Sequence, residues 1–227
     1  MTYQLDFTSL GAYWPQFLAG ALTTLQFTLY ATALGLVIGI VGAIARGSHV
    51  GWLRLVAGIY VEVVRNTPFL IQIFFLFFGL ASLGLRMPIF VAAVLAMVIN
   101  VGAYSTEIVR AGIESVHPSQ IEAAESLGLS RFQIYRDIIL KPALERVYPS
   151  LTSQFTLMML MSSVTSQVSA EELTGAANNI QSVTFRSMET YLIVGLLYLL
   201  LTLLLKAGFW GLGQVLFPRR RRLGTVL

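Results

Sequence analysis

Long apolar stretches restrict the folds open to this chain more than any other feature of its sequence. Five of them reach the length of roughly 20 residues that a helix needs to cross the hydrocarbon core of a bilayer. We assign them to residues 20–45, 52–83, 88–109, 148–168 and 191–212. A soluble globule of this size has no interior that would bury all five. The sequence therefore predicts an all-α membrane protein with about five transmembrane helices.

Composition supports the same class and excludes several kinds of chemistry. Only 11% of the residues are charged, whereas soluble domains carry roughly 25%. The chain has no cysteine, so disulfides, thiolate metal sites and cysteine nucleophiles are excluded. It also lacks a phosphate-binding P-loop, a zinc-protease HExxH motif and a serine nucleophile elbow. We therefore expect no catalytic residue and no metal, and any transport must draw energy from an ion gradient or from another subunit.

Two local patterns predict how the apolar helices bend and pack. The second stretch is too long for one straight crossing, and Pro68 in Arg65-Asn-Thr-Pro68 removes a backbone donor and disfavours helix just before it. We expect a hinge or break there. In the first stretch, Gly35 and Gly39 have the GxxxG spacing of closely packed helices. This spacing serves equally for a contact within the chain and for a contact between two chains.

Basic residues follow the first, third and fifth stretches, which all end on the same side of the membrane. By the positive-inside rule that side is the cytoplasm. This predicts an external N-terminal segment (residues 1–17), a single transmembrane domain (residues 18–216) and a basic cytoplasmic tail (residues 217–227). We interpret Arg219–Arg222 in that tail as a topological anchor, with a nucleic-acid or anionic-lipid site as the alternative.

The loop between the third and fourth stretches is hydrophilic and has the signals of two short helices. Pro118 suits a first helical position, and Gly128 suits a left-handed helix end. Ser130 and Gln133 have the spacing of a capping box, which predicts a second helix directly after the glycine. We therefore expect a helix-turn-helix within about residues 113–140 on the cytoplasmic side.

Several polar side chains fall within the predicted membrane helices. Glu62 with Arg65, and Glu107 with Arg110, are each three residues apart on one helix face, so we expect structural ion pairs. The uncharged group is the candidate substrate path: Gln72, Asn100, Gln154, Ser162, Ser163 and Thr165. For each of these residues alone, a hydrogen bond between helices is the alternative.

These motifs together resemble a known family. Glu122-Ala-Ala, then Gly128, and then Ile138 and Leu140 resemble the EAA loop of ABC importer permeases. Arg65-Asn-Thr-Pro68-Phe-Leu resembles the branch that imports polar amino acids such as histidine, glutamine, arginine and opines. The resemblance implies the type I importer architecture, in which the loop forms a cytoplasmic coupling helix.

The resemblance also implies roles and partners. Glu122, Ala123, Ala124 and Gly128 would couple the chain to two ABC ATPase subunits, which use ATP and magnesium, whereas this chain would bind no cofactor. A second permease copy or a homologous permease chain would complete the path. An extracytoplasmic substrate-binding protein would deliver a polar amino acid to the bacterial inner membrane, and no nucleic acid would take part.

Two other functions remain open from the residues alone. The chain would be an ion-coupled secondary transporter if Glu62 or Glu107 relayed a proton or sodium ion. It would be a membrane anchor if the cytoplasmic loop merely recruited a soluble enzyme. An anchor would tolerate apolar replacements at Gln72, Asn100 and Gln154, whereas a transport path would not.

Overall fold

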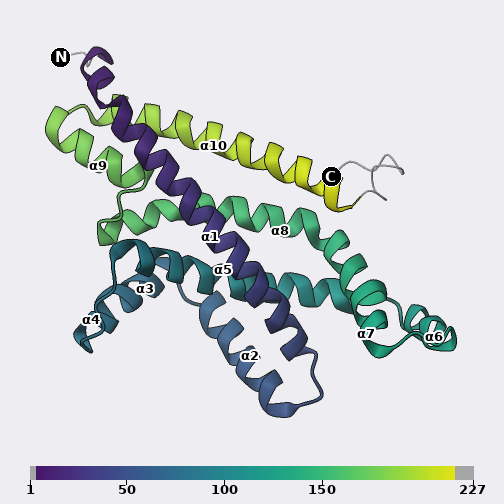
Figure 1. Ribbon diagram of the computed structural model, residues 1–227. Coiled ribbons are helices and arrows are strands. Elements are labelled where there is room, and N and C mark those ends of the chain that lie inside the picture. Colours follow the sequence, from purple (N-terminus) through teal and green to yellow (C-terminus); the bar gives the residue numbers. More distant parts are fainter. Residues whose placement is uncertain (1–3, 218–227) are drawn as a thin grey trace.

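The computed structural model describes residues 4–217, and this part of the chain is helical without any strand (Figure 1). Its elements in chain order are η1 (Thr8–Tyr13), α1 (Trp14–Arg46), α2 (Gly51–Arg65), α3 (Phe69–Phe74), the π-helix η2 (Phe75–Gly79), α4 (Leu80–Ser82), α5 (Ile89–Glu114), α6 (Pro118–Ser126), α7 (Arg131–Gln133), the π-helix η3 (Ile134–Leu140), α8 (Lys141–Met161), η4 (Ser162–Val168), α9 (Leu173–Thr184) and α10 (Ser187–Leu216). The predicted tail residues Arg219–Arg222 lie outside the described part.

The five apolar stretches are helical except at residues 66–68, 83 and 88, which confirms the predicted all-α membrane class. Among the described residues, α1 with η1, α5 and α10 are each long and apolar enough to cross a membrane. The bent pair formed by α2 and by residues 69–82 counts as a fourth crossing if it is one span. Helix α8 is less apolar because Thr152, Ser153 and Gln154 interrupt its middle. The count of five spans therefore stays a prediction.

The break predicted at Pro68 is present. Helix α2 ends at Arg65 and α3 begins at Phe69. The helix direction bends by 108° between α2 and the segment 69–82. Pro68 has an extended backbone with ψ 140°, as expected for a residue that cannot continue the hydrogen bonds of the preceding helix. The sharp bend places the exposed, polar Arg65–Thr67 turn beside α5 and α8.

The glycines of α1 pack against α5 within the same chain, and Figure 1 shows α1 crossing α5. A Cβ atom added at Gly35 would overlap Val101, and one added at Gly39 would overlap Ser105. Small residues let two helix backbones approach closely, which is how membrane helices gain dispersion energy without a hydrophobic driving force. The structure thus assigns the GxxxG spacing to an internal contact.

Polar contacts fix the two ends of the bundle. At one end, Arg46 of α1 lies 3.4 Å from Glu107 of α5, and the hydroxyl of Tyr148 in α8 donates to the Phe209 carbonyl of α10 over 2.7 Å. Arg146 of α8 also donates to the Ser115 carbonyl at the end of α5, so the ends of α1, α5 and α10 lie at the same end of the bundle. At the opposite end, the backbone N–H of Asp6 donates to the buried carboxylate of Glu189 over 3.0 Å.

A second buried carboxylate joins three helices near that opposite end. Glu172 is fully buried and accepts hydrogen bonds from the Gly175 N–H at 2.8 Å and from the Tyr198 hydroxyl at 2.7 Å. Thr24 of α1 lies against the same group and accepts a bond from the Leu173 N–H. Burial raises the pKa of the Glu172 carboxyl, and the hydrogen bonds oppose that shift only in part.

Candidate functional site

The loop between α5 and α8 forms the predicted helix-turn-helix. Helix α6 begins at Pro118, and Gly128 follows it with φ +74°, a conformation that favours glycine. Ser130 then caps α7 in a complete capping box, because its hydroxyl accepts from the Gln133 N–H and the Gln133 side chain accepts from the Ser130 N–H. Figure 1 shows this hairpin projecting beyond one end of the long helices.

The four residues assigned to coupling do not share one environment. Glu122, Ala123 and Gly128 are exposed, whereas Ala124 is 3% exposed and lies inside the hairpin, where α6 contacts η3. No hydrogen bond or ion pair of the Glu122 side chain occurs within residues 4–217. The small side chain of Ala124 therefore serves the packing of the hairpin itself.

Two apolar residues of the hairpin were missed by the sequence analysis. Leu127 is 81% exposed and Phe132 is 71% exposed, on either side of the Gly128 turn. In a sequence they resemble ordinary core positions, and only the fold reveals that no helix within residues 4–217 covers them. Large exposed apolar side chains rimmed by polar residues are typical of protein interaction sites.

The base of the hairpin is fixed to the long helices. Arg146 of α8 donates to the backbone carbonyl of Ser115 at the end of α5 over 2.7 Å and also to the Ser115 hydroxyl. Gly112 allows α5 to approach the backbone of Ala143, where a Cβ would lie 3.0 Å from the carbonyl oxygen. These contacts hold together the two helix ends that the hairpin connects.

Of the two carboxylate–arginine pairs expected from the sequence, the described structure contains the Glu107–Arg110 pair but not the Glu62–Arg65 pair. Arg110 forms a salt bridge of 2.8 Å with Glu107, and Arg46 approaches the same carboxylate. Glu62 is instead bonded by the Asn66 side chain at 3.0 Å, and in the described part of the chain no ion pair joins it to Arg65. The Arg65 guanidinium lies over the Tyr104 ring, 5.3 Å from its centroid.

A cavity of about 440 Å³ lies beside the Pro68 break. It is lined by Arg65, Asn66, Thr67, Pro68, Phe69, Asn100, Tyr104, Gln154, Leu157 and Met161. Its walls come from α5, α8 and the turn between α2 and α3. The volume is in the range of small-molecule sites, and the lining carries one cation and no carboxylate.

Of the six uncharged candidates for the substrate path, Asn100 and Gln154 line this cavity. The side chain of Gln72 accepts a hydrogen bond of 3.0 Å from the Asn100 amide. The Gln72 amide in turn donates to the Val64 carbonyl, which links α3 to α2 across the break. The Oδ1 atom of Asn100 is buried without a hydrogen-bond partner in the described structure.

The other three candidates lie elsewhere. Ser162 and Thr165 are fully buried, and their hydroxyls donate to backbone carbonyls three residues earlier. The Ser163 hydroxyl is bonded in the same way to Leu160. Sequence reasoning also missed the cavity positions of Arg65 and Tyr104, because the approach of α2 to α5 is set by the bend at Pro68.

Comparisons with known proteins agree with this arrangement. The family of binding-protein-dependent transport system inner membrane components matches residues 32–209. The glutamine transport system permease protein of Escherichia coli (strain K12) is 37% identical over 89% of this chain and 93% of its own length. The octopine transport system permease protein of Rhizobium radiobacter is 32% identical, with 90% and 87% covered.

Solved structures give the same result. A crystal structure of an amino acid ABC transporter with histidines has a TM-score of 0.85 and 37% identity, and the match covers 96% of this chain and 100% of that chain. The inward-facing MetNI methionine ABC transporter has a TM-score of 0.74 at 18% identity, covering 91% and 98%, and so supports the fold alone.

Proposed function

Since the chain belongs to the family of binding-protein-dependent transport system inner membrane components and is an amino-acid ABC transporter permease subunit, we propose that ATPase subunits drive it through the α6–α7 hairpin. In this proposal a polar amino acid passes into the cytoplasm through the cavity beside Pro68. Two ATPase subunits hydrolyse ATP, a second permease chain completes the path, and a binding protein delivers the substrate from outside.

The observation that carries the coupling role is the surface of the hairpin. Leu127 and Phe132 present exposed apolar groups on the hairpin. The same hairpin carries Glu122, whose side chain has no hydrogen bond or ion pair within residues 4–217, and a helix N-terminus at Pro118. Burying one such apolar side chain contributes about 1.5–3 kcal/mol. Burial of both side chains in a groove of the partner would contribute this free energy twice and so stabilise docking of the hairpin.

The cavity at Pro68 supports the path. Arg65 supplies a charge that suits an amino-acid carboxylate, and Asn100 and Gln154 supply amide groups that suit a polar substrate. Met161, Leu157 and Phe69 provide the apolar remainder of the lining. In contrast, Glu107 is held by two arginines, which leaves it poorly suited to the ion relay of a secondary transporter.

The contacts between helix ends support the proposed orientation. The hairpin, the end of α1 with Arg46 and the end of α10 lie at one end of the bundle, and the sequence places the basic clusters there. By the positive-inside rule this end faces the cytoplasm, and the segment around Asp6 faces outward. The proposed location is the bacterial inner membrane.

The experiment is co-purification of the tagged chain from its native membrane in mild detergent, with partners identified by mass. We expect a P-loop ATPase in stoichiometric amount. Leu127→Ser and Phe132→Ser should each weaken its affinity by about 10- to 100-fold, because each loses about 1.5–3 kcal/mol of burial and roughly 1.4 kcal/mol changes a dissociation constant tenfold. Gly128→Asp should abolish coupling between ATP hydrolysis and uptake, since it places a charged side chain in the left-handed turn.

Leu83→Ser is the matched control. Leu83 is 76% exposed in the turn after α4, at the opposite end of the bundle in the proposed orientation. This substitution should leave ATPase recovery unchanged. Full recovery of the ATPase with the doubly substituted Leu127→Ser, Phe132→Ser chain would contradict the docking role of the hairpin.

A further inference from the structure

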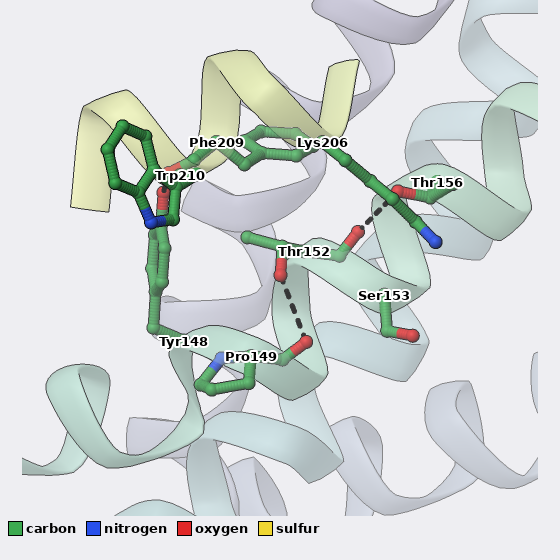
Figure 2. A pocket seen from close by; sticks show the side chains of 8 residues that line it. All are labelled: Tyr148, Pro149, Thr152, Ser153, Thr156, Lys206, Phe209 and Trp210. Atoms are coloured by element: carbon green, nitrogen blue, oxygen red, sulfur yellow. Dashed lines mark hydrogen bonds between the residues drawn. The ribbon is translucent and has the colours of Figure 1, made fainter. Parts of the chain in front are cut away.

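A second hollow lies between α8 and α10, apart from the cavity beside Pro68 (Figure 2). It is a groove of about 380 Å³ with hydroxyl groups on α8, and with Lys206 and Trp210 on α10. Figure 2 shows the Lys206 side chain extending toward Ser153 and Thr156, while Trp210 lies at the other end of the groove beside Tyr148. No acidic residue is among those that line it.

Lys206 is the unusual member of this groove. It is exposed toward the C-terminal end of α10, the most apolar of the long helices in the described structure, and within residues 4–217 its amino group has no ion pair and no hydrogen bond. The Ser153 hydroxyl on the facing helix is likewise unbonded in the described structure, whereas the Thr152 and Thr156 hydroxyls donate to backbone carbonyls. Ionisable groups in membrane helices are costly and generally have a partner.

The groove lies at the end of the bundle that carries the hairpin. Tyr148 donates to the Phe209 carbonyl across its mouth, and Trp210 is 59% exposed beside it. Tyrosine and tryptophan concentrate where the hydrocarbon core meets the headgroup layer. On the other side of Lys206, the exposed Leu199 and Leu203 continue along α10 toward the membrane interior.

We propose that this groove binds an anionic phospholipid of the cytoplasmic leaflet. The lipid phosphate accepts hydrogen bonds from the Lys206 ammonium and the Ser153 hydroxyl, and an acyl chain lies along Leu199 and Leu203. Charge complementarity selects this occupant, because the groove offers a cation and a free hydroxyl donor with no carboxylate to repel a phosphate. The site is separate from the cavity beside Pro68, through which we propose that the substrate passes.

The test uses the tryptophans as contact probes in the full chain. The sequence has three tryptophans, Trp14, Trp52 and Trp210, so Trp14→Phe with Trp52→Phe leaves Trp210 alone in the groove. The chain is reconstituted in mixed vesicles of phosphatidylglycerol and phosphatidylcholine, with bromine on the chains of one lipid at a time. Bromine quenches tryptophan fluorescence on contact, so the two series give the relative affinity of the two lipids at Trp210.

We expect phosphatidylglycerol to be favoured at Trp210 about fivefold, the factor that one lysine near an anionic lipid surface contributes. Lys206→Gln should reduce this preference to about one, and Lys206→Arg should retain it. High salt should weaken it, as screening requires. Arg54→Gln is the matched control, because it removes one positive charge near the same membrane boundary on α2 and should leave the preference at Trp210 unchanged.

Three results would overturn the proposal. One is equal quenching of Trp210 by both lipids in the parent chain, and another is a preference that survives Lys206→Gln. The third is the absence of quenching by either lipid, which would mean that a second permease copy covers the groove. Relief of quenching by a transported amino acid would assign the groove to the substrate and would equally refute the lipid site.

Discussion

Replacing Gly35 by alanine tests whether α1 and α5 pack as closely as the structure shows. A Cβ at this position would lie 2.5 Å from Val101 Cγ1 and 2.7 Å from Val101 Cβ, whereas carbon atoms pack at about 3.5–4.0 Å. Val101 is fully buried, and its β-branched side chain has one strongly preferred rotamer in a helix. The added methyl group therefore has to push the two helices apart by about 1 Å, because neither side chain can turn away.

The expected cost follows from two opposing effects. Overpacking by one methyl group in a close-packed core costs about 1–3 kcal/mol, while alanine gains roughly 0.5–1 kcal/mol over glycine inside a helix. The net destabilisation is therefore about 0–2.5 kcal/mol, with a central value of about 1 kcal/mol. For a chain of this length each kcal/mol lowers the midpoint of thermal unfolding by about 2–4 °C, so the central value predicts that Gly35→Ala lowers it by about 2–4 °C.

Gly195 provides the matched control. It lies inside α10, and a Cβ there meets no atom within 4 Å. Gly195→Ala should therefore raise the unfolding midpoint by about 1–4 °C, since only the helix preference of alanine acts. Both variants are measured by thermal unfolding of the purified chain in the same detergent. A midpoint for Gly35→Ala equal to or above that of Gly195→Ala would refute the close α1–α5 contact.

Three further predictions concern the hairpin base, the buried carboxylate and the cavity. Arg146→Ala should uncouple ATP hydrolysis from uptake several-fold without loss of assembly, because it frees the Ser115 end of α5, and unchanged coupling in reconstituted vesicles would count against this role. Burial raises the pKa of Glu172 above its ordinary 4.5, so the folded chain holds this proton more tightly than the unfolded chain, and its stability should fall as pH rises from 4.5 through the raised folded-state pKa. Glu172→Gln should remove this component of the pH dependence when unfolding is measured across that pH range. A slope that persists unchanged in the variant would contradict this prediction. Asn100→Leu and Gln154→Leu should each change uptake kinetics while assembly is retained, and unchanged kinetics in both would exclude these residues from the path.

Much of the hairpin was predictable from the sequence because its signals are local. Pro118, Gly128 and the Ser130–Gln133 capping box each act through hydrogen bonds and backbone angles within a few residues. The burial of Ala124 was not predictable, because it depends on where η3 lies against α6. The exposure of Leu127 and Phe132 was hidden for the same reason, since an apolar residue carries no mark of whether a distant helix covers it.

The cavity shows the same division between local and distant determinants. The break at Pro68 follows from the covalent geometry of proline, but the meeting of Arg65 with Tyr104 requires that break to bring α2 against α5. Polarity alone selected six candidates for the path. Only the packing of the helices separated Asn100 and Gln154, which line the cavity, from residues whose hydroxyls are satisfied by their own backbone.

The sequence by itself determined that the chain is a helical membrane protein, where its second apolar stretch breaks and where the hydrophilic hairpin between α5 and α8 turns. Hydrophobic length, proline geometry and helix capping act over a few residues or one helix, so they can be read without a fold. The tertiary structure alone decided that the Gly35–Gly39 face meets α5 of the same chain and that Lys206 of α10 faces Ser153 of α8. Those choices depend on contacts between helices far apart in the sequence, where the same side-chain pattern is compatible with several partners.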